Sequence, residues 1–111
     1  MISDSSYLVF NVNALSSASM ASNQTSISYD ASTSFHYAVQ SVWTGASPVG
    51  TIEVQASLDG LNWGNIYTVA VASNSGSDIH DLGSLAFPYL RVAYAFTSGT
   101  GLLNVKLCAK G

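Results

Sequence analysis

The stretch 50–63 constrains most strongly what this chain can fold into. Apolar and polar side chains alternate along its first half, which is the pattern of a β-strand with one buried face. The apolar positions are Ile52, Val54 and Ala56, and the polar positions are Glu53, Gln55 and Ser57. Asp59-Gly60 then predicts a tight turn. Trp63 follows that turn as a residue suited to cap the core of a sandwich.

The rest of the chain repeats this pattern, and no stretch has convincing helical periodicity. Besides 51–58, the predicted strands are 7–13, 24–29, 35–43, 63–72, 78–82, 89–96 and 102–109. Between them we expect a loop at 14–23, a turn at 45–50, a loop at 73–77, a turn at 83–88 and a hairpin connection at 97–101. Short strands joined by Gly- and Ser-rich turns predict an all-β fold. We expect an antiparallel two-sheet β-sandwich, jelly-roll-like, with about eight strands in a single domain of 111 residues.

The alternation also predicts which side chains face the core. We expect Phe35 to share a face with Tyr37, and we expect Ile79 and Phe96 to point inward. The central core candidates are Trp43, Val54, Trp63, Val92, Tyr94 and Val105.

Charge is scarce in this chain. Charged residues make up 8% of it, against about 25% in an ordinary soluble domain. The only cations are Arg91, Lys106 and Lys110, too few for the clustered basic patches that bind nucleic acids or anionic membranes. A surface of uncharged polar groups promotes association. We therefore expect a protein that packs beside other proteins.

The single cysteine, Cys108, excludes an internal disulfide and fits synthesis in a reducing cytoplasm. Residues 1–6 have neither the cations nor the apolar core of a signal peptide, and no run reaches transmembrane length. We interpret residues 1–6 as a candidate N-terminal arm that reaches a partner.

Catalytic patterns are not recognisable. No serine lies in a Gly-x-Ser-x-Gly elbow, Glu53 lies within a strand, and the aspartates mostly lie at turns. We therefore predict no enzymatic activity and no cofactor.

Three residues, Asp78, His80 and Asp81, are weak candidates for a metal site, because carboxylates and an imidazole bind divalent cations. The alternative, which we favour, is that this segment is a solvated loop that ends in a short edge strand. We therefore predict no metal. Asp59 has two similar interpretations. It is either a cation ligand together with Asn62 or, as we favour, an acceptor for backbone N–H groups in its own turn.

Exposed aromatic side chains on a β-sandwich stack on sugar rings or anchor protein interfaces. The candidates for an interface or a ligand site are Tyr7, Tyr29, Tyr67 and Tyr89, and we expect core packing to account for at least half of the tyrosines. Glu53 and Arg91 are a candidate cross-strand pair.

Two motifs carry a family resemblance: Ser-x-Asp-Gly-x-x-Trp at 57–63 and Tyr-x-Arg-Val at 89–92, followed by Gly-x-Gly at 99–101. From Trp43 to Ala109 this layout resembles small structural β-sandwich proteins of tailed bacteriophages, of the head-decoration or virion-surface type. It is similar, more weakly, to discoidin-like carbohydrate-binding jelly rolls.

The resemblance implies a non-enzymatic structural component of a phage virion, made in the host cytoplasm. Its most specific version is a capsid decoration protein on the outer surface of the shell. The expected partners are other virion proteins, above all the major capsid protein, and further copies of this chain, for example in a trimer. The alternative is a carbohydrate-binding or host-adhesion module of a tail or head fibre, with a glycan as ligand. Head, tail and baseplate positions all remain open.

Overall fold

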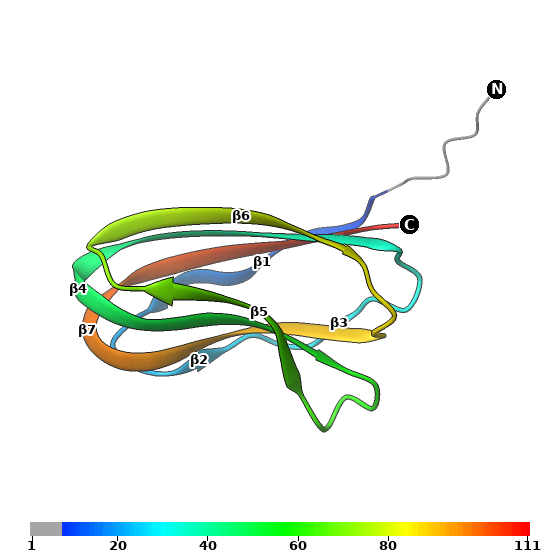
Figure 1. Ribbon diagram of the computed structural model, residues 1–111, viewed down its shortest axis with the longest axis horizontal. Helices are drawn as coiled ribbons and strands as arrows, with labels where there is room; N and C mark the ends of the chain where they lie inside the picture. The colour runs from blue at the N-terminus through cyan, green and yellow to red at the C-terminus, as the bar shows by residue number, and fades with distance from the viewer. Residues whose placement is uncertain (1–7) are drawn as a thin grey trace.

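The computed structural model describes residues 8–111, which contain seven β-strands and no helix. The strands are β1 (Leu8–Ser19), β2 (Gln24–Thr25), β3 (Tyr29–Asp30), β4 (His36–Ser57), β5 (Gly64–Val71), β6 (Ser75–Ser84) and β7 (Tyr89–Lys110) (Figure 1). The predicted all-β class is therefore confirmed. The predicted arm at residues 1–6 and the candidate Tyr7 lie outside the described residues. Within 8–111, nothing forms a helix long and apolar enough to cross a membrane.

Two strands of 22 residues each, β4 and β7, form the frame of the fold. They pair antiparallel over nearly their whole length, from His36 opposite Lys110 to Ser57 opposite Tyr89. A straight strand of this length would span about 70 Å, whereas the molecule is 51 Å long. The paired ribbon therefore folds back on itself, and it does so at residues 45–50 and 97–101, on the left of Figure 1. We call this region the bend end.

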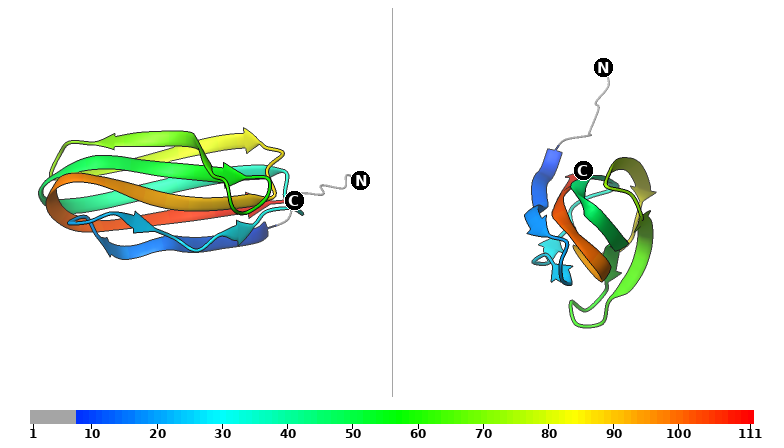
Figure 2. Two further views of the ribbon diagram at one scale, coloured as in Figure 1. Left: turned by 90° about the horizontal axis from the view of Figure 1, so that it is seen from below. Right: turned by 90° about the vertical axis from the view of Figure 1, so that its left-hand side faces the viewer.

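The bend divides the ribbon into two layers that face each other (Figure 2). In layer one, the first half of β4 lies between β6 and the second half of β7, and β1 pairs with that half of β7. In layer two, the second half of β4 pairs with β5 and with the first half of β7, whose other edge holds β2 and β3. All pairs are antiparallel, so the predicted two-sheet, jelly-roll-like sandwich is confirmed.

The strand boundaries differ from the prediction because the pairing continues through both bends. Residues 45–50 do not interrupt β4, where register shifts beside Val49 absorb the curvature. The predicted hairpin at 97–101 is wrong, since the segments on either side of it lie in different layers and do not pair with each other. The predicted loops are shorter than expected. Residues 14–19 of the loop 14–23 belong to β1, and residues 75–77 of the loop 73–77 belong to β6. The predicted strand 24–29 is reduced to β2 and β3.

Glycine allows the bend end to close. A Cβ at Gly45 would lie 2.1 Å from the carbonyl oxygen of Thr100, and one at Gly99 would lie 2.1 Å from that of Ser47. Gly99 also has a φ of 85°, which side-chain-bearing residues rarely adopt. The two strands of the ribbon therefore lie backbone against backbone at the bend.

The core lies between the layers and confirms most of the predicted inward positions. Trp43, Val54, Val92, Tyr94 and Val105 are all buried. Met20 is also fully buried, although it lies in the predicted loop 14–23.

Four predicted core positions are wrong. Phe35 precedes the first residue of β4, lies outside its alternation, and is 66% exposed. Ile79 is 76% exposed because its partner in the register, Gln40, lies on the outer face of layer one. Phe96 is partly exposed where β7 enters the bend. Trp63 is only half-buried, since it precedes β5 and packs against Arg91.

Candidate functional site

The turn at 57–62 is locked by two side chains. Ser57 Oγ accepts hydrogen bonds from the N–H groups of Asp59 (3.2 Å) and Gly60 (2.8 Å), and it donates one to Asp59 Oδ1 (2.9 Å). Asp59 Oδ1 also accepts from the N–H groups of Leu61 and Asn62 (2.8 Å each), and Asn62 Nδ2 donates to Asp59 Oδ2 (2.8 Å). The N–H groups of Asn62 and Leu61 are the main reason that the pKa of Asp59 lies below its ordinary value. Asp59 therefore acts within its turn, as the sequence predicts.

This locked turn holds two leucines in solvent. Leu58 is 72% exposed and Leu61 is 82% exposed. Beside them, a cavity of about 310 Å³ is lined by Leu58, Asn62 and Phe87. Phe87 also lines a second cavity, of about 320 Å³, together with Phe35 and Pro88. We call the surface formed by residues 31–35, 58–62 and 85–88 the loop end. It lies opposite the bend end (Figure 1).

The two sequence motifs meet beside this turn. The guanidinium of Arg91 lies 4.3 Å from the centroid of the Trp63 ring. Arg91 Nε donates to Gln55 Oε1 (2.7 Å), and Gln55 Nε2 donates to Glu53 Oε1 (3.1 Å). The register places Arg91 opposite Gln55 and not opposite Glu53, so Gln55 bridges the predicted pair. The ring of Tyr89 lies beside Gly60, 3.8 Å from where a Cβ would stand.

At the edge between β5 and β6, an aromatic pair closes the space between the layers. The rings of Tyr67 and His80 stack with centroids 4.0 Å apart and planes 4° apart. The Tyr67 hydroxyl donates to Asp78 Oδ2 (2.6 Å), and this bond is the main reason that the pKa of Tyr67 is raised. Asp81 Oδ1 instead accepts from the N–H of Gly83 (2.8 Å). Across residues 8–111, no three His, Cys, Asp or Glu side chains gather in a way that could hold a metal ion.

The opposite edge is closed by a second aromatic pair. Phe10 on β1 stacks on Tyr29 on β3, with centroids 5.6 Å apart and planes 28° apart. The three candidate tyrosines in the described part of the chain, Tyr29, Tyr67 and Tyr89, thus all have neighbours within the molecule. Their role in binding stays a prediction.

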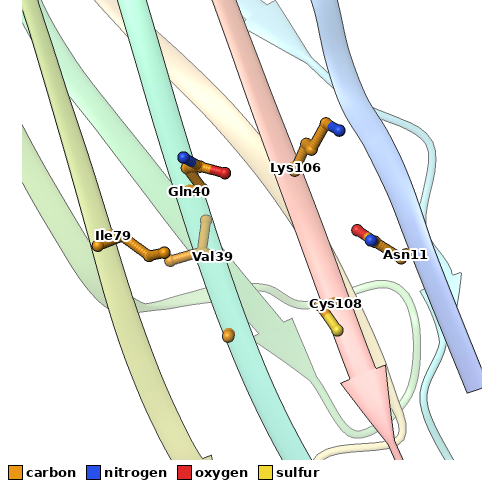
Figure 3. Close-up of a pocket in the computed structure, with 7 residues that line it drawn as sticks. Asn11, Val39, Gln40, Ile79, Lys106 and Cys108 are labelled. Carbon is orange, nitrogen blue, oxygen red and sulfur yellow. The ribbon is translucent and has the colours of Figure 1, made fainter. Parts of the chain in front are cut away.

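The outer face of layer one carries a hollow that the sequence does not predict (Figure 3). Its floor is formed by Ala38 and Cys108, which are partners in the β4–β7 register. Long side chains stand two residues away on the same face: His36 and Gln40 on β4, and Lys106 and Lys110 on β7. Ile79 borders the hollow on β6 and Asn11 on β1. Two cavities of about 240 and 460 Å³ share Ala38, Ile79 and Cys108 in their lining.

This hollow brings Cys108 and His36 to one face of the sheet, whereas the ring of His80 stacks on Tyr67 at the edge of the inner face. His36 lines the larger cavity together with Cys108. Within residues 8–111, no hydrogen bond links Cys108 Sγ to an imidazole. An adjacent base is one of the ways in which a cysteine is activated as a nucleophile.

Comparison with known proteins gives a fold but no family. No protein-family model matches the sequence, and no curated protein matches it. Among solved structures, the chain is similar to the PBSX exported protein XepA (TM-score 0.58, 15% identity, 94% of this chain and 36% of that chain). It is also similar to PirA (TM-score 0.55, 14% identity, 98% and 96%) and to the coat protein of Tobacco streak virus (TM-score 0.52, 12% identity, 100% and 88%). The chain thus spans about a third of the length of XepA. At these identities the likeness shows a shared β-sandwich fold.

Proposed function

We propose that this protein is a non-enzymatic structural component of a phage virion, most specifically a decoration protein on the outer surface of the capsid. The observation that carries the proposal is a rigid apolar end on a nearly uncharged sandwich. Leu58 and Leu61 stand in solvent on a turn that six hydrogen bonds hold in place.

Leucines held in this way are suited to bind another protein. Large contiguous apolar patches are rare on monomeric soluble proteins and mark interaction sites, and exposed leucines on a fixed turn are suited to form part of one. A turn that is already rigid loses little conformational freedom on binding, so more of the contact energy appears as affinity. The low charge of the chain also limits repulsion between closely packed subunits.

Two further observations support a virion as the location. The coat protein of Tobacco streak virus is built on a similar sandwich, so this kind of fold serves in a viral shell. The motifs at 57–63 and 89–92, which resemble those of small structural proteins of tailed bacteriophages, form the locked turn and its Trp63–Arg91 support.

The carbohydrate-binding alternative has less support from the geometry. One face of the Tyr67 ring is covered by His80, and Tyr29 is stacked on Phe10. Binding of a sugar ring needs an open aromatic face. Titration with sugars should therefore give no heat, whereas binding that is lost in Tyr67→Ala would favour the alternative.

Particle association tests the proposal directly. Virus particles are purified by density gradient from cells that carry this gene, and their proteins are quantified by mass spectrometry. We expect the chain to migrate with the shell protein in a fixed ratio. The double variant Leu58→Ser/Leu61→Ser should stay in the soluble fraction, while the matched control Thr68→Ser, at an exposed position on β5, should not. A wild-type chain found only in the soluble fraction would contradict the proposal.

A further inference from the structure

We propose that copies of this protein associate head to face, with the loop end of one copy seated in the hollow on the outer face of layer one of the next. The occupant of the hollow is thus a second copy of the same chain. The inference rests on the same surface as the proposed function and names a second copy as the protein that covers Leu58 and Leu61, whichever particle the protein belongs to.

Both surfaces carry apolar side chains or an apolar floor that a partner could cover. The loop end projects Leu58 and Leu61 from a rigid turn. The hollow offers an apolar floor of Ala38 and Cys108 with Ile79 along one side. Ile79 is largely exposed and packs beneath nothing else in the described part of the chain, so a second copy would cover it.

The charges of the two surfaces also correspond. Asp59 lies between the two leucines in sequence, and its hydrogen bonds keep it ionised because they lower its pKa. Lys106 and Lys110 flank the hollow, and they are two of the three cations of the whole chain. One carboxylate, Asp81, also lies at the rim and accepts from the N–H of Gly83. The lysines outnumber it, so the hollow attracts a carboxylate-bearing turn.

The same charges disfavour the symmetric arrangements. Two loop ends placed together would bring Asp59 beside its own copy, and two hollows placed together would bring the lysines together. A contact between different surfaces avoids both kinds of repulsion. Such a heterologous contact closes into a ring, for example a trimer, or continues as a filament.

A disulfide cross-link tests the contact, because the only cysteine of the chain lies on the floor of the hollow. In Leu61→Cys, mild oxidation should link the new cysteine to Cys108 of a neighbouring copy and give a ladder of oligomers on a non-reducing gel. The ladder should disappear in Leu61→Cys/Cys108→Ser. The control Thr68→Cys places an exposed thiol on the outer face of layer two and should give no ladder. A missing ladder in Leu61→Cys, or an equal one in Thr68→Cys, would overturn the proposal.

Charge reversal at the hollow gives a second measurement that does not depend on oxidation. Lys106→Glu should lower the mass measured by light scattering to that of a monomer, whereas Lys106→Arg should keep the wild-type mass. Circular dichroism confirms that both variants are folded. A wild-type protein that is monomeric at all concentrations, or a Lys106→Glu variant with the wild-type mass, would contradict a head-to-face contact. Failure here would leave the particle experiment unaffected, so the two ideas are tested separately.

Discussion

The bend end and the loop end of this sandwich are built on opposite principles. At the bend end the two strands of the β4–β7 ribbon pack closely through glycines, and a Cβ at Gly45 would overlap the backbone of Thr100. At the loop end, large side chains such as Leu61 stand free of the fold. One end fixes the architecture, and the other carries side chains that the architecture does not need. Surface contacts with partners can therefore vary at the loop end without disturbing the core.

The largest effect should come from a methyl group at the bend. Gly45→Ala places its Cβ 2.1 Å from the Thr100 carbonyl oxygen and 2.6 Å from Gly101 Cα, and backbone atoms cannot rotate away. We expect a loss of about 3 kcal/mol in the free energy of unfolding, measured by urea denaturation.

The control for that variant is Gly64→Ala. A Cβ at Gly64 would meet nothing within 4 Å, so alanine should be neutral or stabilise the protein by about 0.5 kcal/mol. Equal losses in the two variants would show that the bend is not specially constrained.

A smaller loss is expected where the loop end is anchored. Ser57 is buried, and its hydroxyl serves the N–H groups of Asp59 and Gly60. Ser57→Ala should cost about 1–3 kcal/mol in the same assay, because two donors lose their acceptor. Ser77→Ala, at an exposed position on β6, should leave the urea midpoint unchanged. If Ser57→Ala is as stable as wild type, the turn is not held by this hydroxyl.

The stability that Asp59 gives to the turn at 57–62 should also depend on pH. The pKa of Asp59 in the folded protein lies below its ordinary value of 3.8, so its contribution to stability is present above that pH and is lost as the pH falls through the lowered pKa. Wild type should therefore melt at a higher temperature than Asp59→Asn at neutral pH. The gap in Tm should narrow as the pH falls below about 3.8. A gap that stays constant from neutral to acidic pH would show that the ionised form of Asp59 is not what holds the turn.

The smallest effect on stability is expected at the leucines themselves. Leu61→Ser removes an exposed apolar side chain and should change the free energy of unfolding by less than about 0.5 kcal/mol. Its association with other copies should nevertheless weaken. A large loss of stability would show that Leu61 packs within its own fold.

The sequence predicts local patterns well in this protein. The alternation in 51–58 and 89–96 correctly identifies strands, and the Asp59 turn forms as expected. Glycine and proline near 45–50 correctly indicate a change of direction. They cannot show that the pairing of β4 with β7 continues through it, because that depends on a partner 50 residues away.

The hollow on layer one could not be predicted for a related reason. Its floor depends on Ala38 being paired with Cys108, and only the register of β4 and β7 brings these two small residues together. The sequence alone shows a small residue between two long ones on each strand, as in His36-x-Ala38-x-Gln40. It does not show that the two small residues lie side by side. Ile79 was misplaced because alternation in a short edge strand does not say which face is buried.

Sedimentation velocity over a wide range of concentrations tests most directly the claim that copies of this protein pack beside one another through the loop end. Wild type should sediment as an oligomer, and Leu58→Ser/Leu61→Ser should sediment as a monomer with unchanged stability. Identical sedimentation of the two proteins, whether as monomers or as oligomers, would contradict this account.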